Sequence, residues 1–383
     1  VFYEHLKKLM QRGHSIEFFP EGGRSRSGKL MPPRPGIISM ILRSFLGMDE
    51  KQVSFVPISI NYEKVLEGNS YINEVMGAEK KKENLKDIFS VFRDFRNYLG
   101  EAYLQFGEPI NLNALLKEYP LSDYSSEKDW LFKVTPVLGK KIMTTINDST
   151  VVTSTALFSL AILNSDGFSI SNRELVSRIE LLKSLLAEDK YSAKTLICEK
   201  TGEEIIDQMR KLGFLSKEDI NDRISLTNLE AAKLSFYRNN ISHLLIFESL
   251  ICGFFQYQKE IVKEDLLQSI KMIYPFLKEE FFLKWDEADL DQLINLKLNK
   301  LINKNLILED SNNYKRPDFK SREFYETQSL GKLVQPSIDR FYVLISQLWK
   351  NSAEHISKNE LERNSLEILK NLEKTQARLT PEF

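Results

Sequence analysis

The sequence is poor in the residues on which many binding sites depend. It has two cysteines, Cys198 and Cys252, and four histidines among 383 residues. Cysteines this far apart in apolar surroundings exclude a disulfide framework and a cysteine-rich metal site, so we expect both to be reduced core residues of a cytosolic protein. Charge of one sign is also missing, because 53 basic residues face 54 acidic ones. This balance excludes a polycation that binds nucleic acid along its whole length.

Long hydrophobic runs are missing as well. No stretch approaches the roughly 18 apolar residues that suggest a membrane-spanning helix. The longest apolar segments, residues 151–163 and 243–255, therefore predict buried core helices. A chain of 383 residues can form two or three domains. It opens with Val1 directly in an amphipathic pattern, and we expect it to be a piece of a longer protein.

Residues 1–115 alternate between helical and extended patterns, which is typical of α/β domains. The expected helices lie before Gly13, between Pro35 and Gly47, and over residues 88–99. The expected strands cover residues 16–19, 53–60 and 102–106. Pro57, inside the second strand, indicates an edge, a bulge or a strand end that faces a site.

Residues 116–383 change character, because strand signals nearly vanish and helical patterns take over. Ser171 and Glu174 have the spacing of a capping box for a helix that continues to Leu186. Two segments, residues 203–227 and 293–318, each predict a helix followed by a hairpin, as in a winged helix. The predicted fold is thus the later half of an α/β domain followed by a mostly α-helical region with winged-helix-like units.

The most informative segment is a glycine-rich loop between the first expected strand and the second helix. Gly22 and Gly23 allow backbone N–H groups to converge on an anion. Arg24 and Arg26 supply paired donors that match phosphate oxygens, and Lys29 and Arg34 add positive charge. The first 36 residues carry seven basic and three acidic side chains in a chain that is otherwise neutral. These features predict a phosphate-binding loop.

Glu21 does not fit a site for phosphate alone, because a carboxylate repels phosphate. We expect it to fix an arginine or to accept a hydrogen bond from a substrate hydroxyl. A ligand with a phosphate at one end and hydroxyl groups at the other would suit both halves of the loop. The alternative is a solvated basic turn, without a ligand, in which Glu21 forms a salt bridge to an arginine.

The loop sequence Phe-Pro-Glu-Gly-Gly-Arg-Ser-Arg-Ser-Gly-Lys-Leu, residues 19–30, resembles the third signature block of the glycerolipid acyltransferases. Residues 53–68 are similar to the fourth block, with Pro57 at its characteristic proline. Further similarity to the bacterial membrane-bound glycerol-3-phosphate branch of that family lies in residues 236–245 and 274–285 and at the end of the chain. The resemblance covers essentially the whole sequence.

This resemblance implies that an acyl group is transferred from acyl-CoA or acyl-ACP to the sn-1 hydroxyl of glycerol 3-phosphate. The product would be a lysophosphatidate, in the first step of phospholipid (CDP-diacylglycerol) biosynthesis. It implies no metal and no cofactor besides the acyl thioester co-substrate, and it places the protein peripherally on the cytoplasmic face of a bacterial inner membrane. By position in the blocks, the substrate-binding residues are Glu21, Gly22, Gly23, Arg24, Ser25, Arg26 and Pro57.

The sequence departs from the family in one important respect. The family's general base is the histidine of a His-x-x-x-x-Asp motif, and none of the four histidines here begins one. We expect the motif to precede Val1, and we expect the 383-residue chain by itself to be inactive. His243 comes nearest in spacing, with Glu248 five residues later, but we interpret it as a structural polar residue.

Three other functions remain open at this stage. The same loop would serve an acyltransferase that acts on dihydroxyacetone phosphate or lysophosphatidate. A winged-helix nucleic-acid-binding protein is an alternative of another class, although its first candidate helix is acidic, with Glu203, Glu204 and Asp207. A scaffold role for residues 116–383 is compatible with either enzyme.

Overall fold

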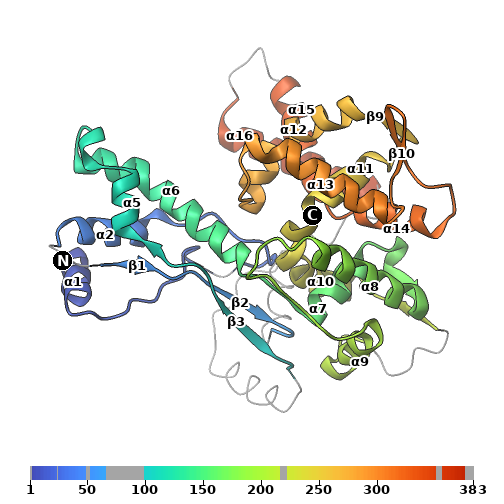
Figure 1. Ribbon diagram of the computed structural model, residues 1–383, viewed down its shortest axis with the longest axis horizontal. Coiled ribbons are helices and arrows are strands. Elements are labelled where there is room, and N and C mark those ends of the chain that lie inside the picture. Colours follow the sequence, from blue (N-terminus) through green and yellow to red (C-terminus); the bar gives the residue numbers. More distant parts are fainter. Residues whose placement is uncertain are drawn as a thin grey trace.

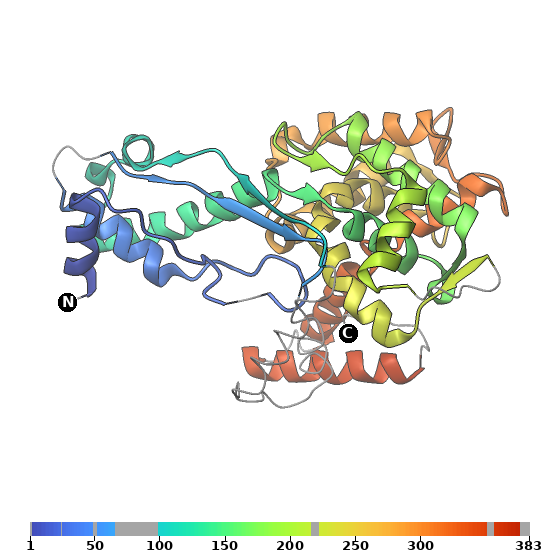
Figure 2. The same ribbon diagram turned by 90° about the horizontal axis from the view of Figure 1, so that it is seen from below.

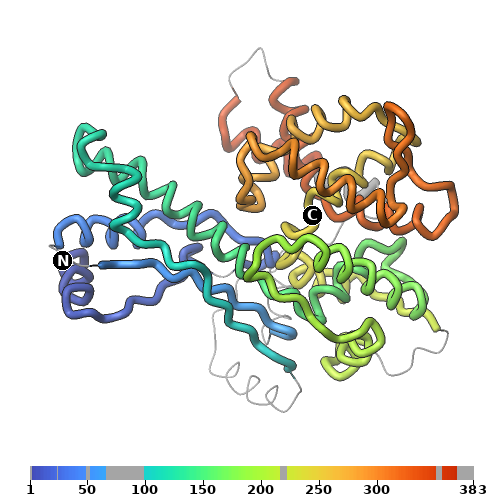
Figure 3. Tube along the Cα trace, viewed as in Figure 1, coloured from blue at the N-terminus to red at the C-terminus, as the bar shows by residue number. Residues whose placement is uncertain are grey.

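The computed structural model describes residues 2–23, 25–48, 52–65, 99–215, 222–350 and 356–375. They form a small N-terminal lobe and a larger helical region, which lie side by side along the long axis (Figures 1 and 2). The long helix α6 (Glu127–Asp148) extends from the lobe to the helical region. Strand β2 (Ile58–Tyr62) runs towards the helical region and β3 (Ala102–Phe106) returns beside it (Figure 3).

The N-terminal lobe packs around a hydrophobic core of its own. Its further elements are α1 (Phe2–Gln11), α2 (Pro35–Leu46), β1 (Ser54–Phe55), β4 (Ile110–Asn111), α5 (Leu112–Glu118) and the 3-10 helix η1 (Leu121–Asp123). Ile38 and Leu42 of α2 pack with Trp130 and Leu138 of α6 in this core. The first two of the three predicted helices are confirmed, with Pro35 in the first turn of α2 and the left-handed Gly13 just after α1.

The strands of this lobe pair in two antiparallel ladders, β1 with β4 and β2 with β3. The predicted strand over residues 53–60 is confirmed but interrupted at Pro57, whose carbonyl accepts a hydrogen bond from the Gly107 N–H at 2.8 Å. The strand over residues 102–106 is confirmed, and the helix over residues 88–99 falls almost entirely outside the described residues.

The predicted strand over residues 16–19 is wrong. The segment is not a strand, because within the described part of the chain no neighbouring strand supplies backbone hydrogen bonds to it. Ile16 and Phe18 are half-buried against the core of the lobe, whereas Phe19 is 68% exposed. A local sequence pattern can suggest extended backbone, but a strand also needs a partner from elsewhere in the chain.

The β2–β3 ribbon is polar on its buried side and apolar on its exposed side. Ser59 and Asn61 are buried, while Ile58 and Ile60 beside them are exposed. Because cross-strand partners share a face, Phe106 and Leu104 extend the exposed apolar side opposite Ile58 and Ile60.

The end of the ribbon is fixed to the helical region by polar contacts. Asn61 Oδ1 accepts a hydrogen bond from the Val151 N–H at 3.1 Å. The fully buried Glu63 carboxylate accepts one from Gln208 Nε2 at 2.5 Å. These contacts determine where the lobe and the helical region meet.

The helical region has a second and larger hydrophobic core. Its helices are α7 (Ser154–Leu163), α8 (Asn172–Glu188), α9 (Gly202–Leu212), α10 (Asn228–Ile241), α11 (Ile246–Phe254), α12 (Lys263–Phe281), α13 (Leu290–Asn303), α14 (Arg322–Gly331), α15 (Gln335–Lys350) and α16 (Lys358–Thr375). Short 3-10 helices are η2 (Asp166–Phe168), η3 (Ser242–Leu245) and η4 (Glu287–Asp289). Every residue of α7 is buried, which confirms the core helix expected from residues 151–163, and residues 243–255 form η3 and α11, which are also largely buried.

The local signals of this region are largely confirmed. The Ser171–Glu174 capping box is present at the start of α8. Cys252 is buried, Cys198 is half-buried, and both thiols are free. Among the described residues, no helix has the length and apolar character needed to cross a membrane.

The two segments with winged-helix-like patterns differ. The short strands are β5 (Val151–Val152), β6 (Ser169–Ser171), β7 (Leu196–Ile197), β8 (Arg223–Ser225), β9 (Glu260–Val262), β10 (Leu308–Asp310) and β11 (Asn313–Lys315). After α13, β10 and β11 form the predicted hairpin, and β9 extends it to a three-stranded sheet. After α9, the described strand β8 instead pairs with β6, which precedes α8. Helix plus local hairpin is therefore confirmed for the second segment only.

Candidate functional site

The glycine-rich loop is closed at its base by backbone hydrogen bonds. The Arg34 N–H donates to the Pro20 carbonyl at 2.7 Å, and the Gly22 N–H donates to the Phe19 carbonyl at 3.0 Å. Gly22 has a φ of +67°, and a Cβ there would lie 2.7 Å from Arg34 Cγ. A glycine is thus required at this turn by both backbone angle and space.

The inner part of the loop forms a second turn around Ser25. Its hydroxyl donates to the Lys29 carbonyl at 2.5 Å and accepts from the Gly28 N–H at 3.1 Å. Gly28 has a φ of +80°, and a Cβ on it would lie 2.1 Å from the Phe236 carbonyl oxygen of α10. Asn239 Nδ2, also from α10, donates to the Ser27 carbonyl at 2.8 Å. Helix α10 therefore holds the tip of the loop in one position.

Lys29 ties the loop to a second helix. Its ammonium forms an ion pair with Glu280 of α12 at 2.9 Å and lies 5.0 Å from the centre of the Phe281 ring. Burial lowers the pKa of Lys29 to about 8. The same Glu280 oxygen also accepts hydrogen bonds from Ser337 and Arg340 of α15. The sequence suggested that Lys29 adds positive charge for a ligand, but here Glu280 compensates that charge.

Glu21 and Ser25 are the predicted site residues that line a cavity. The Glu21 carboxylate accepts a hydrogen bond from the Met31 N–H at 3.2 Å, and burial raises its pKa against the opposite effect of that hydrogen bond. A raised pKa means that the site favours the neutral acid more than water does.

The other predicted residues occupy different positions. Gly22, Gly23 and Arg26 are exposed, and they are absent from the cavity lining. Arg24 lies outside the described residues. Pro57 is buried at the break between β1 and β2 and is not itself part of the lining.

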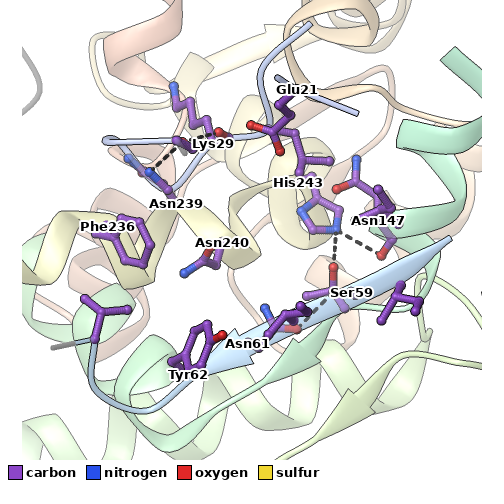
Figure 4. Close-up of a pocket in the computed structure, with 18 of the residues that line it drawn as sticks. Glu21, Lys29, Ser59, Asn61, Tyr62, Asn147, Phe236, Asn239, Asn240 and His243 are labelled. Atoms are coloured by element: carbon purple, nitrogen blue, oxygen red, sulfur yellow. Dashed lines mark hydrogen bonds between the residues drawn. The ribbon is translucent and has the colours of Figure 1, made fainter. Parts of the chain in front are cut away.

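The cavity has a volume of about 730 Å³ and lies where the loop, the ribbon and the helical region meet (Figure 4). The loop and β2 supply two of its sides. The helical side is formed by α6, α10, η3 and α12, and its lining residues are Ile146, Asn147, Thr150, Phe236, Asn239, Asn240, His243, Glu280 and Phe281. A mostly apolar cavity with a few convergent polar groups is the usual form of a small-molecule site. Sequence reasoning noticed residues 236–245 but assigned no site role to them.

His243 is part of this helical side. Its Nε2 lies 3.4 Å from the Asn147 carbonyl oxygen and 3.4 Å from Thr150 Oγ1. The Tyr191 ring packs edge-on against the imidazole, with 5.1 Å between ring centres. Burial lowers the pKa of His243 to about 4, so the ring is neutral near pH 7. Because a carbonyl only accepts hydrogen bonds, Nε2 carries the proton in this neutral ring.

The described residues contain no group of three or more histidine, cysteine, aspartate or glutamate side chains arranged to hold a metal ion. The polar groups of the cavity are instead amides, hydroxyls, an imidazole, carboxylates and the ammonium groups of Lys29 and Lys64. Such groups bind hydroxyls and other neutral polar ligand groups through hydrogen bonds.

Comparison with known proteins identifies the family. Residues 71–383 match the family model of the glycerol-3-phosphate acyltransferase C-terminal region, and residues 1–61 match the acyltransferase model. The chain belongs to the glycerol-3-phosphate acyltransferase C-terminal region family. The family resemblance inferred from the loop and its neighbouring block is thereby confirmed. Both matched segments line the cavity. The loop and most of β2 come from the first segment, and the helical side comes from the second.

Curated relatives of the chain are named glycerol-3-phosphate acyltransferase. A glycerol-3-phosphate acyltransferase of Pseudomonas putida (strain GB-1) is 32% identical over 391 residues, which cover 100% of this chain and 47% of the relative. One from Pseudomonas aeruginosa (strain LESB58) is 31% identical over 392 residues, with the same coverage. One from Pseudomonas fluorescens (strain Pf0-1) is 32% identical over 370 residues, 94% of this chain and 44% of the relative. The chain thus spans about half the length of the curated relatives it matches.

Proposed function

We propose that this chain is part of a glycerol-3-phosphate 1-O-acyltransferase and supplies much of its acceptor site. In the reaction, the sn-1 hydroxyl of glycerol 3-phosphate attacks the thioester carbonyl of acyl-CoA or acyl-ACP. An ester bond forms, the carbon–sulfur bond breaks, and the hydroxyl proton leaves with the thiol. The product is a lysophosphatidate, which enters phospholipid synthesis.

The observation that carries this proposal is the loop at the cavity. A Glu-Gly-Gly-Arg-Ser-Arg-Ser segment in the position of the family's third block is held by α10 and α12 and places Glu21 and Ser25 at a cavity of about 730 Å³. A cavity this large holds a three-carbon phosphate and leaves room for the start of an acyl chain. The exposed apolar side of the β2–β3 ribbon, next to the cavity, offers further surface for that chain.

We assign the phosphate to the glycine-rich loop with Arg24, Ser25 and Arg26, as the block resemblance implies. Backbone N–H groups at Gly22 and Gly23 and guanidinium groups are suited to phosphate oxygens. We assign Glu21 to accept a hydrogen bond from a glycerol hydroxyl, because its half-buried carboxylate lines the cavity. Pro57 interrupts the strand beside the cavity and stays assigned to the acyl side.

The general base is not among the residues described here as lining the cavity. His243 is fully buried with a pKa of about 4, and its Nε2 donates to Asn147, so it is a weak proton acceptor near pH 7. No His-x-x-x-x-Asp occurs in the 383 residues. We therefore assign this chain binding and positioning of the acceptor, without the proton abstraction.

We further propose peripheral contact with the cytoplasmic face of a bacterial inner membrane, because the acyl donor and the product are amphiphiles. Helix α15 supports this, since Tyr342, Ile345 and Trp349 expose aromatic and aliphatic side chains there. Aromatic residues of this kind favour membrane interfaces. Sedimentation with vesicles of phosphatidylglycerol and phosphatidylethanolamine tests the contact, and the chain should remain in the supernatant if the assignment is wrong.

The decisive experiment measures acyl transfer by the natural protein that carries these residues. Purified protein is given acyl-CoA or acyl-ACP together with glycerol 3-phosphate, dihydroxyacetone phosphate or lysophosphatidate. We expect glycerol 3-phosphate to be the preferred acceptor and one thiol to be released for each lysophosphatidate formed. A preference for either other acceptor, or nucleic-acid binding without transfer, would contradict the proposal.

A further inference from the structure

Three polar residues of α10 and η3 face the same cavity but differ in what they already bind. Asn239 donates to the Ser27 carbonyl and accepts from the Arg238 guanidinium at 3.2 Å. His243 is occupied by Asn147 and Thr150 of α6 and the residues just after it. Asn240 lies between them, half-buried, and within the described part of the chain its side chain makes no hydrogen bond. Figure 4 shows its amide among the lining residues.

We propose that Asn240 binds the C2 hydroxyl of glycerol 3-phosphate and is thereby a specificity-determining residue supplied by the helical region. This role rests on the proposed function, because glycerol 3-phosphate is the acceptor proposed above. The role deepens that function by assigning one substrate group to one side chain outside the family's loop.

The chemistry of the side chain selects the kind of group it binds. An asparagine amide offers two N–H donors and one acceptor oxygen without charge. A hydroxyl is both a donor and an acceptor, so the two groups can satisfy each other. A half-buried amide that faces a cavity without a protein partner is free to bind a ligand, and a ligand that displaces water from it must replace the hydrogen bonds to water.

The substrate leaves one hydroxyl for this amide. The phosphate of the three-carbon acceptor is assigned to the loop, which α10 holds through Phe236 and Asn239. The C1 hydroxyl must remain open to the thioester carbonyl. The C2 hydroxyl, between them, is therefore the group that the helical side can bind without blocking the reaction.

The distance between the loop and Asn240 is fixed by the contacts of its neighbours. The Asn239 amide holds Ser27 at 2.8 Å, and Gly28 packs directly on the Phe236 carbonyl. Both contacts come from the turn of α10 that precedes Asn240. A ligand held by the loop thus meets Asn240 in a reproducible position, which is what discrimination between similar acceptors requires.

Calorimetry on the 383-residue chain tests the role with two ligands, glycerol 3-phosphate and 1,3-propanediol monophosphate, which lacks the C2 hydroxyl. The unsubstituted chain should prefer glycerol 3-phosphate. Asn240→Ala should weaken glycerol 3-phosphate binding by about three- to tenfold, the range for one net hydrogen bond, and leave the analogue unchanged. Asn295→Ala, at an exposed asparagine of α13, is the matched control and should change neither.

A second variant protects the test against a folding defect. Asn240→Asp keeps the size and the acceptor oxygen, so it should retain part of the preference for glycerol 3-phosphate while weakening both ligands through repulsion of the phosphate. Thermal unfolding of each variant shows whether the fold is intact. If Asn240→Ala prefers glycerol 3-phosphate over the analogue as strongly as the unsubstituted chain does, the role of Asn240 is overturned and the proposed function still stands. Absence of glycerol 3-phosphate binding by the unsubstituted chain would overturn both.

Discussion

Gly28 lies where the glycine-rich loop packs against the backbone of α10, and its replacement is a sharp test of that contact. An added Cβ would lie 2.1 Å from the Phe236 carbonyl oxygen and 2.8 Å from its carbon. The φ of +80° is also a conformation that alanine disfavours. Because the obstructing atoms belong to the backbone of α10, no side-chain rotation relieves the clash. Gly28→Ala should therefore push the loop off α10.

The expected magnitude follows from these two effects. A left-handed backbone costs a non-glycine residue about 1–2 kcal/mol, and overpacking typically adds about 1–3 kcal/mol. Docking of the loop should thus weaken by about 2–5 kcal/mol. A loss of about 2 kcal/mol corresponds to a roughly thirtyfold rise in the population of the detached loop.

Limited trypsin digestion measures this population. Cleavage after Lys29 requires its ammonium to leave Glu280, so the rate should follow the detached fraction when docking is fast. We expect at least a tenfold faster cut after Lys29 in Gly28→Ala, with correspondingly weaker glycerol 3-phosphate binding. Gly23→Ala is the matched control, since that glycine has no atom within 4 Å of an added Cβ and its φ is not positive. If Gly28→Ala is cut no faster than Gly23→Ala, the packing of the loop on α10 described above is wrong.

Three further predictions follow from the site. In the natural protein, Arg24→Ala or Arg26→Ala should raise the Michaelis constant for glycerol 3-phosphate by about ten- to a hundredfold, because a charged hydrogen bond is lost. The Michaelis constant for the thioester should change little. A change in the thioester constant alone would assign the loop to the acyl donor. The pKa of His243 is about 4 in the folded chain against an ordinary 6.5, so its contribution to stability is complete above pH 6.5 and is lost as the pH falls to 4. Between these pH values, the free energy of unfolding measured with urea should fall by about 3 kcal/mol less in His243→Gln than in the unsubstituted chain. An equal pH dependence of the two chains would refute the burial of the ring. The 383-residue chain without a His-x-x-x-x-Asp should show no saturable acyl transfer in a thiol-release assay, and robust turnover would refute the assignment of the base outside these residues.

Much of the fold could be predicted because its signals are local. Capping residues mark the start of α8, Pro35 marks the start of α2, and a mostly apolar sequence marks α7 as buried. Failures occurred where the answer depends on distant partners. The segment 16–19 has a strand-like sequence but no described partner, and β8 pairs with β6 although a local hairpin was expected. Local propensity is a weak guide to such pairings because tertiary context decides them.

The candidate site could be predicted only on the side of the loop. The glycines, the serine and the carboxylate of residues 19–30 carry a recognisable pattern. By contrast, the bond from Asn239 to Ser27 joins residues 212 positions apart, and the ion pair of Lys29 with Glu280 joins residues 251 apart. Neither spacing leaves a signal in one sequence. The charge of Lys29 was therefore assigned to a ligand when its partner is a carboxylate of α12.

The helical region holds the glycine-rich loop in position. A glycine-rich loop gains the ability to close on phosphate by giving up side chains, and it thereby loses the contacts that would hold it in one conformation. Here the missing restraint comes from outside the loop, from α10 through Asn239 and the Phe236 carbonyl and from α12 through Glu280. Glu280 in turn binds Arg340 of α15, so the position of the loop depends on three helices of the helical region. Residues from the segments matched by the two family models therefore line one cavity, in which the loop of the first is positioned by the helices of the second.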